Sequence, residues 1–335
     1  MNSKIIIGPV QERRKRPNNL VDKDLNLFEH EFNLALPAVT MTELKNVSIL
    51  RNVIFSLKTL KFYKSFTNIY VTRKKYFLKM LRLFLTVPQY TENGIWITDE
   101  ISSEYFHWFT DALSRLKAIE SSYNESYDLK NNFPVVLPDF YSTKPYIGDS
   151  LELLGYTPLY YNTKKRLQVA NLISCSHPAP TGNYNSEVIR SINESLTLKD
   201  ELAPTRKIYI SRKKALKRKV LNEDEVIQLL LKHDYEIHVF EDYTYQKQLE
   251  IMSSTKTLVG LHGAGLTNMI FMNKGGQVLE FRNANDSHNN CYFSLTSSLQ
   301  HDYYYLNCKG DKEDTNAVNV TIDLTELEML LKQFT

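Results

Sequence analysis

The chain has 335 residues, a formal net charge of +3 at neutral pH and 42% hydrophobic residues. This length allows two domains with full cores, and the near-neutral charge gives no reason to expect a nucleic-acid-binding protein. No apolar run is long enough to span a bilayer, and the first 20 residues lack the apolar core of a signal peptide. Cys175, Cys291 and Cys308 fit neither a disulfide framework nor a zinc site, so we expect a reducing, cytoplasmic environment.

The N-terminal part has an unusual charge pattern. No acidic residue occurs between Glu43 and Glu92, whereas lysine and arginine recur among aromatic and aliphatic residues, and residues 76–85 read as an amphipathic basic helix. Such a helix can lie on an anionic membrane surface or face a phosphate-bearing partner, or its lysines can simply be solvated on the outside of a domain. A nucleic-acid binder is a rival interpretation, but no nucleic-acid-binding motif accompanies the segment.

The first half of the chain predicts an α/β domain. We expect strands at residues 95–97, 134–137 and 167–173, and a helix over residues 104–116. Within that helix His107 and Asp111 are four residues apart, so they share one face. An imidazole beside a carboxylate can accept and hold a proton. Taken without other information, the pair is more simply explained by a role in helix stability alone.

The second half alternates strands and helices more regularly. Strands are expected at residues 208–210, 236–240, 257–261, 278–281 and 303–306, and helices at residues 186–198, 223–232, 245–253, 266–272 and 288–299. This alternation predicts a parallel sheet with both faces covered. Residues 176–185, which include two prolines and a glycine, are the best linker candidate. We therefore expect domains at residues 1–182 and 183–335, with the final helix a candidate to cross back.

A glycine-containing loop follows the strand at residues 257–261. His262, Gly263, Ala264 and Gly265 lead into a helix-compatible segment that starts at Leu266. Free backbone N–H groups and the positive end of a helix at such a turn can hold a phosphate group. Because the loop is neither G-x-G-x-x-G nor a P-loop, on its own it is as compatible with a bare tight turn.

Charged residues follow or end neighbouring strands of the predicted sheet. Ligands of parallel sheets bind at the carboxyl ends of the strands. Arg212, with Lys213 and Arg218 near it, could clamp the oxygens of a diphosphate. Glu280 is placed to accept hydrogen bonds from a ribose. Each residue alone could instead be an ordinary surface charge.

Three separated motifs carry a family resemblance. They are YFHWFTDALSRL at residues 105–116, IYISR at residues 208–212, and VGLHGAGLTN at residues 259–268 followed by VLE at residues 278–280. In this order and spacing they resemble glycosyltransferase family 61, whose bacterial members are often labelled capsular polysaccharide biosynthesis proteins. The third motif adds Asn268 to the candidate nucleotide-binding residues. Ser114 and Lys274 stand where the family usually has proline.

The resemblance implies a GT-B architecture, in which two Rossmann-like domains face each other across a cleft and the C-terminal one holds the nucleotide. It also implies inverting transfer from a nucleotide sugar, commonly UDP-linked, to a hydroxyl of a glycan or lipid-linked glycan in surface polysaccharide synthesis, without an essential metal or cofactor. We favour Asp111 as the base with His107 orienting it, and the reversed assignment stays open. The alternative is a non-catalytic nucleotide- or glycan-binding protein of the same fold.

Overall fold

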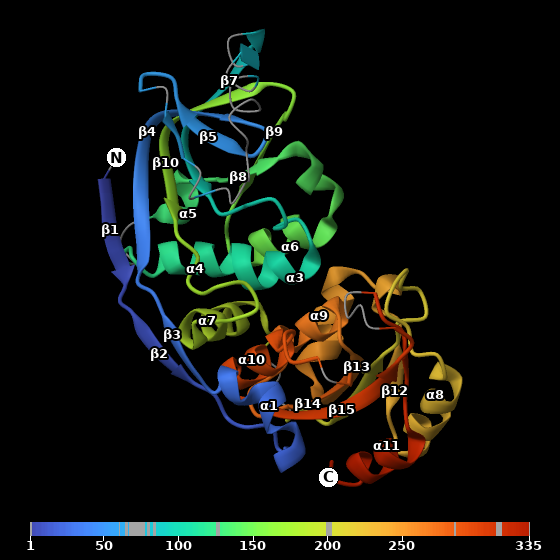
Figure 1. Cartoon of the computed structure of the whole chain (residues 1–335). Helices are drawn as coiled ribbons and strands as arrows, with labels where there is room; N and C mark the ends of the chain where they lie inside the picture. Colours follow the sequence, from blue (N-terminus) through green and yellow to red (C-terminus); the bar gives the residue numbers. More distant parts are fainter. Residues whose placement is uncertain are drawn as a thin grey trace. The chain divides into compact units, whose positions relative to one another are not determined.

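The computed structural model of the chain (Figure 1) describes residues 2–59, 61–63, 66, 78, 81–82, 85–124, 128–198, 203–284, 286–312 and 317–334. Contacts between Cα atoms divide the chain into two compact units. The first unit contains residues 1–10 and 36–181, and the second contains residues 11–35 and 182–335. Each unit combines helices with a sheet, so the chain is of the mixed α/β class.

The first unit is built on an eight-stranded mixed sheet in the order β6-β5-β4-β10-β7-β8-β9, with β1 beside β4. β10, β7, β8 and β9 are parallel, whereas β1, β4, β5 and β6 pair antiparallel, as do β4 and β10. Only part of this sheet is therefore of the parallel, Rossmann-like type. The strands are β1 (Asn2–Ile7), β4 (Val39–Leu50), β5 (Val53–Ser56), β6 (Lys61–Phe62), β7 (Pro88–Trp96), β8 (Val135–Pro138), β9 (Pro158–Tyr161) and β10 (Arg166–Cys175).

The antiparallel part follows from short connections. β4 and β5 are separated by only Arg51 and Asn52, and Arg51 has φ 54°, which closes a tight hairpin turn. Parallel strands need longer crossovers, which this unit builds from helices. These are α3 (Tyr105–His107), the π-helical η4 (Trp108–Ala112), α4 (Leu113–Glu120), α5 (Leu129–Asn132), the 3₁₀ helix η5 (Asp139–Thr143) and α6 (Pro145–Leu153).

The second unit contains a six-stranded sheet in the order β12-β11-β13-β14-β15-β16. All neighbours are parallel except β15 and β16, which confirms the parallel sheet predicted from the alternation. The strands are β11 (Arg206–Ile210), β12 (Glu236–His238), β13 (Thr255–Leu261), β14 (Gln277–Asn283), β15 (Asp302–Gly310) and β16 (Val320–Thr321). The helices are α7 (Ser186–Leu196), α8 (Glu223–Lys232), the 3₁₀ helix η6 (Phe240–Asp242), α9 (Tyr245–Ser253), the 3₁₀ helix η7 (Ala264–Phe271), α10 (Cys291–Ser298) and α11 (Leu324–Leu331).

Both faces of this second sheet are covered, because strand side chains alternate between them. Tyr209, Val259 and Leu279 face a core shared with α8 and α11, which lie together on one side (Figure 1). The residues that alternate with them face the opposite side, which α7, α9, α10 and η7 cover. Glu280 therefore points away from the α8 and α11 core, toward a face that also carries polar groups.

Residues 11–35, which we expected in the first domain, pack on the second unit. They form the strand β2 (Val10–Arg13), which pairs with β3 (Asn33–Leu36), and three short helices between them: η1 (Asp22–Asp24), α1 (Leu25–Phe28) and η2 (Glu29–Glu31). Phe28 is fully buried against Phe293, Tyr303 and Tyr305, with ring centroids 5.3, 6.1 and 4.9 Å away. This aromatic cluster holds the arm on the sheet.

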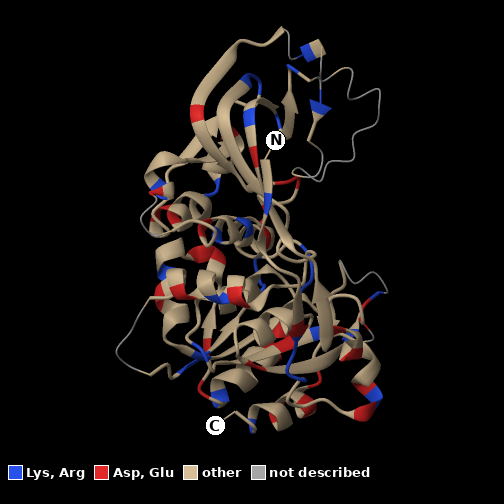
Figure 2. Ribbon diagram, turned by 90° about the vertical axis from the view of Figure 1, so that its left-hand side faces the viewer, with Lys and Arg blue, Asp and Glu red and all other residues tan. Residues whose placement is uncertain are grey.

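Lysine and arginine are interspersed with aspartate and glutamate along the ribbon of both units (Figure 2), as a net charge of +3 suggests. Among the described residues, no helix has the length and apolar character to cross a membrane. The basic helix predicted at residues 76–85 lies outside the described residues, apart from positions 78, 81, 82 and 85.

We predict that Phe28→Ala destabilises the second unit by about 3–5 kcal/mol, because removing a fully buried ring leaves a cavity in the aromatic cluster. Val21→Ala, on the same arm but 46% exposed, should change stability by less than about 0.5 kcal/mol. Denaturant unfolding followed by far-UV circular dichroism measures both changes. Trp96 and Trp108 are the only tryptophans and both lie in the first unit. Tryptophan fluorescence therefore reports on the first unit. A loss of stability seen only in that signal would contradict the packing of the arm on the second unit.

Candidate functional site

The predicted His107 and Asp111 pair lies where the long helix of the first unit widens. Trp108–Ala112 form a π-helical turn between α3 and α4, in which the N–H of Leu113 donates to the carbonyl of Trp108 five residues back. Such turns are rare, occur singly inside α-helices and are frequent at functional sites. The helical periodicity of the sequence predicts the helix but contains no sign of this local widening.

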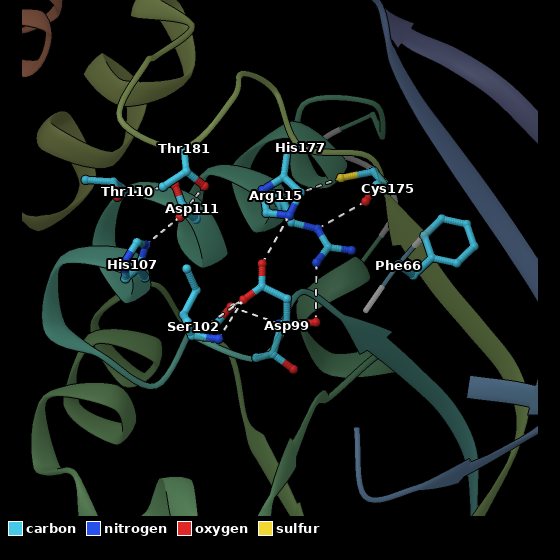
Figure 3. A network of polar contacts seen from close by, with 12 residues as sticks. Phe66, Asp99, Ser102, His107, Thr110, Asp111, Arg115, Cys175, His177 and Thr181 are labelled. Atoms are coloured by element: carbon cyan, nitrogen blue, oxygen red, sulfur yellow. Dashed lines mark hydrogen bonds and ion pairs between the residues drawn. The ribbon is translucent and has the colours of Figure 1, made fainter. Parts of the chain in front are cut away.

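The two side chains form a close contact (Figure 3). His107 Nδ1 lies 2.8 Å from Asp111 Oδ2, and the Thr181 hydroxyl donates to the same oxygen at 3.2 Å. Asp111 is only 4% exposed, whereas the side chain of His107 is 22% exposed. Because the carboxylate is buried and both of its oxygens already accept hydrogen bonds, the imidazole is the more accessible member of the pair.

A second histidine–aspartate pair, which the sequence reasoning missed, lies in the same unit (Figure 3). His177 Nε2 is 3.3 Å from Asp99 Oδ2. The other oxygen of Asp99 accepts hydrogen bonds from the Ser102 hydroxyl at 2.8 Å and from the backbone N–H groups of Ile101 and Ser102 at 3.1 Å. Burial opposes ionisation of Asp99, but these hydrogen bonds and the neighbouring His177 outweigh it and hold the pKa of Asp99 well below its usual range.

Arg115 lies beside this second pair and is 1% exposed. Its guanidinium donates to the carbonyl of Cys175 at 3.0 Å and to the hydroxyl of Ser174 at 2.8 Å, which are neutral acceptors. Asp99 and Asp111 are the nearby carboxylates whose charges favour its protonated form, although burial lowers the pKa of Arg115 overall. A buried guanidinium needs such compensating charge. Arg115 therefore connects the two pairs electrostatically.

The parallel strands explain why these residues meet. β7 and β10 are neighbours, and Ser174 is level with Trp96 in their register. Asp99 follows β7 and His177 follows β10, so both emerge at the same sheet edge. The rule that functional groups gather at the carboxyl ends of parallel strands could have found them, had the sequence shown that these two strands are adjacent.

In the second unit the predicted phosphate-binding residues lie at the topological switch point of the sheet. The chain passes from β11 to β12 on one side and then to β13 on the other side of β11. Arg212 follows β11 and His262 follows β13, and Ile210 is level with Gly260. Open parallel sheets bind ligands in the crevice at this point.

Gly263 brings the arginine and the loop into contact. It has φ 155°, and a Cβ atom at this position would collide with the guanidinium of Arg212. Gly265 also packs closely, because a Cβ atom there would lie 3.0 Å from Ile210 Cγ2. The glycines are therefore required for close packing of the loop against β11 and Arg212, rather than only for a turn.

Arg212 and Arg218 provide two positive charges beside this loop. Arg212 donates to the carbonyls of Arg218 and Lys217 at 2.8 and 2.9 Å, and burial together with the charge of Arg218 lowers its pKa. Arg218 has φ 58° and a buried Nε without a hydrogen-bond partner. Neither arginine forms an ion pair with a carboxylate in the part of the chain that the structure describes. Lys213 is exposed and lies in the same loop.

The segment after the glycine loop differs from the prediction. Ala264–Phe271 form the 3₁₀ helix η7 instead of an α-helix, so the phosphate-binding end of a regular α-helix is not present here. Leu266 and Asn268 are buried, and the Asn268 amide donates to the carbonyl of Gly265 at 2.9 Å. These two residues thus support the loop from within.

Glu280 is enclosed within the protein. It is 0% exposed, and its two oxygens are bonded to His262 Nδ1 and to the Tyr303 hydroxyl, the latter at 2.5 Å. Both oxygens therefore have partners within the protein, and the role in accepting hydrogen bonds from a ribose stays a prediction. Its carboxylate instead orients His262, whose side chain is 15% exposed.

Among the described residues, no group of three or more His, Cys, Asp or Glu side chains is arranged to hold a metal ion, and metal independence stays a prediction.

An open pocket of about 500 Å³ includes Asn273, Lys274 and Gln300 in its lining. These residues precede β14 and β15, at the edge opposite the switch point, and the pocket contains none of the predicted site residues.

Comparison with known proteins places these motifs in a family. The sequence profile described as Glycosyltransferase 61 matches residues 105–279, slightly more than half of the chain. The chain is 34% identical over 127 residues to an EGF domain-specific O-linked N-acetylglucosamine transferase of Drosophila melanogaster, which covers 35% of this chain and 24% of the fly protein. It is 30% identical over 144 residues to the Mus musculus protein of the same name, which covers 41% of this chain and 25% of the mouse protein.

The matched segment thus spans about a quarter of the length of these animal relatives. The relatives do not support the bacterial, capsular subtype that the sequence suggested. The family match includes the His107 and Asp111 helix, Arg212 and the glycine loop. The chain therefore belongs to the glycosyltransferase 61 family, which confirms the enzyme class predicted from the sequence.

Proposed function

We propose that this chain transfers a sugar from a nucleotide sugar to a hydroxyl group of an acceptor, with inversion at the anomeric carbon. The observation that carries the proposal is the switch point of the second unit, where Arg212, Arg218 and His262 gather beside the glycine loop. Arginines without carboxylate partners at such an edge suit the diphosphate of a nucleotide, because guanidinium groups bind phosphate oxygens in a bidentate manner. The same charges stabilise the diphosphate as it leaves.

We assign the base to the first unit. In the proposed reaction the acceptor oxygen bonds to the anomeric carbon while its proton passes to His107 Nε2, and the bond to the diphosphate breaks with its electron pair leaving on the phosphate oxygen. Asp111 holds Nδ1 and stabilises the imidazolium that forms. The burial of Asp111 supports this assignment over the one favoured from sequence, in which Asp111 itself takes the proton.

The identity of the substrates extends the proposal further. We favour a UDP-linked donor, as the family resemblance implies, and UDP-N-acetylglucosamine in particular because the relatives are named as N-acetylglucosamine transferases. For the acceptor we retain the hydroxyl of a glycan or lipid-linked glycan. The GT-B arrangement and independence from metal ions belong to the same proposal, and they rest on the resemblance alone.

The cellular setting is likewise proposed. Scattered, free cysteines are compatible with a reducing cytoplasm, and Cys175 and Cys308 are buried. The acid-free segment between Glu43 and Glu92 suits contact with an anionic membrane surface that carries the acceptor. The rival is a nucleotide- or glycan-binding protein of the same fold without turnover. Release of UDP from UDP-N-acetylglucosamine, with water or a glycan as acceptor, separates the two.

We predict that His107→Gln lowers the rate of UDP release by about 100-fold or more, since general-base catalysis contributes roughly 10²–10⁴-fold. Binding of UDP should stay unchanged in a calorimetric titration. His177→Gln is the matched control, because it changes the other histidine–aspartate pair of the same unit. If His177→Gln abolished turnover and His107→Gln did not, the base would have to be reassigned to the second pair.

We predict that Arg212→Ala weakens UDP binding by about 10- to 100-fold, because it removes a charged donor to the diphosphate. Gly263→Ala should have an effect in the same direction, because a methyl group there displaces the guanidinium. Arg206→Ala is the control, since Arg206 begins the same strand but pairs with Glu236 at the opposite sheet edge. Equal affinity of the Arg212→Ala and wild-type proteins would remove Arg212 from the site.

A further inference from the structure

A polar network in the second unit surrounds His262. Its Nδ1 bonds to Oε1 of Glu280, and Oε2 of the same carboxylate accepts the hydroxyl of Tyr303. Glu280 is 0% exposed, so this carboxylate has no direct contact with solvent. The Nδ1 atom of His262 is therefore the nitrogen that carries a proton, and Nε2 is the nitrogen left for a ligand.

Glu280 is charged in spite of its burial. Burial alone would raise the pKa of Glu280, but the neighbouring charge and hydrogen bond of His262, the charge of Arg282 and the Tyr303 hydroxyl together lower it. An ionised carboxylate that accepts a hydrogen bond from Nδ1–H fixes the tautomer and the orientation of the ring. The same device orients and polarises histidine in many catalytic and metal sites.

Arg282 completes the charge balance of the network. It lies two residues beyond Glu280 on β14, on the same face of the sheet, and is 1% exposed. Its guanidinium donates to the Asn290 side chain at 3.0 Å and contacts the Tyr303 hydroxyl at 3.5 Å, and it lies 4.8 Å from the centre of the Phe28 ring. The negative charge of Glu280 and the positive charge of Arg282 cancel. Protonation of His262 would therefore add one net positive charge, which a bound anion would balance.

The other groups around His262 agree with an anionic ligand. The ring of Tyr292 on α10 packs edge-on against the imidazole, with centroids 5.0 Å apart. On the β11 side, Arg212 touches Gly263, and the charge of Arg218 acts on both Arg212 and Tyr292. The carboxylate of Glu280 is hydrogen-bonded to His262, and it contacts Nδ1 rather than Nε2.

We propose that His262 binds the diphosphate of the nucleotide as an imidazolium, donating from Nε2, and that Glu280, Tyr303 and Arg282 are positioning residues that hold it in that state. This rests on the proposed function for the presence of a nucleotide. It gives Glu280 a role that its burial permits, in place of ribose recognition. Binding of the diphosphate and protonation of His262 are then thermodynamically linked, so the affinity rises as the pH falls.

The test is a calorimetric titration of the full chain with UDP at pH 5.5 and at pH 8.5. UDP itself gains a proton near pH 6, which changes the affinity of every variant in the same way. The informative quantity is therefore the ratio of the UDP affinity at pH 5.5 to the UDP affinity at pH 8.5. This ratio is compared between the wild type and Glu280→Gln. We expect the wild-type ratio to be about tenfold larger, since Gln keeps the shape but not the charge that stabilises the imidazolium.

Two tyrosines on β15 provide a matched pair of variants. Tyr303→Phe removes the hydroxyl that holds Glu280, whereas Tyr305→Phe removes a hydroxyl that donates to Asp24 at 2.8 Å. Both changes delete one oxygen from the same strand and leave the ring in the aromatic cluster. Only Tyr303→Phe should reduce the pH dependence of UDP binding.

The possible outcomes distinguish the proposed function from the proposed role of the network around His262. No UDP binding by the wild type at either pH contradicts the proposed function itself. UDP binding with the same pH dependence in wild type and Glu280→Gln overturns the role of the network and leaves the proposed function standing. As an independent readout, ¹⁵N spectra of the imidazoles, with His262→Gln to assign the signal, should show the Nδ1-protonated form at high pH. The Nε2-protonated form would also overturn the proposal.

Discussion

The buried charge of Glu280 imposes the strongest constraint on the second unit. A carboxylate removed from water is costly unless hydrogen bonds and opposite charge surround it. Here those partners come from three places: the loop after β13 supplies His262, β15 supplies Tyr303 and β14 itself supplies Arg282. Arg282 is in turn covered by the ring of Phe28. The arm of residues 11–35 therefore belongs to this unit for an electrostatic as well as an apolar reason.

The first unit solves a similar problem with the signs reversed. Its buried cation is Arg115, and Asp99 and Asp111 provide the negative charge around it. Each of these aspartates also holds a histidine, so one buried guanidinium supports two polarised imidazoles. In both units candidate site residues follow the carboxyl ends of parallel strands, where chain direction alone brings them together.

The regular parts of the fold were predictable from local patterns. The strands and helices from β11 to β15 follow apolar alternation, and α8 and α9 begin and end where the periodicity does. The motifs at His107, Arg212 and the glycine loop were recognisable as well. Long-range facts were not. Neither the burial of Glu280 nor the partnership of Asp99 with His177 can be seen until strand order and register are known. The 3₁₀ helix after Gly263 likewise reflects tertiary packing rather than local preference.

The π-helical turn at Trp108–Ala112 lies between His107 and Arg115 and sets how these two residues are related along the helix. A turn of this kind holds one residue more than the α-helical turn it replaces, so every later side chain is rotated by about 100° relative to an uninterrupted helix. Arg115 lies beyond the turn and His107 before it, so their relative direction depends on that additional residue. Ser114, whose hydroxyl donates to the Thr110 carbonyl at 2.5 Å, helps to satisfy the widened backbone. Insertion or deletion of one residue within this stretch should therefore change the direction of Arg115 relative to His107.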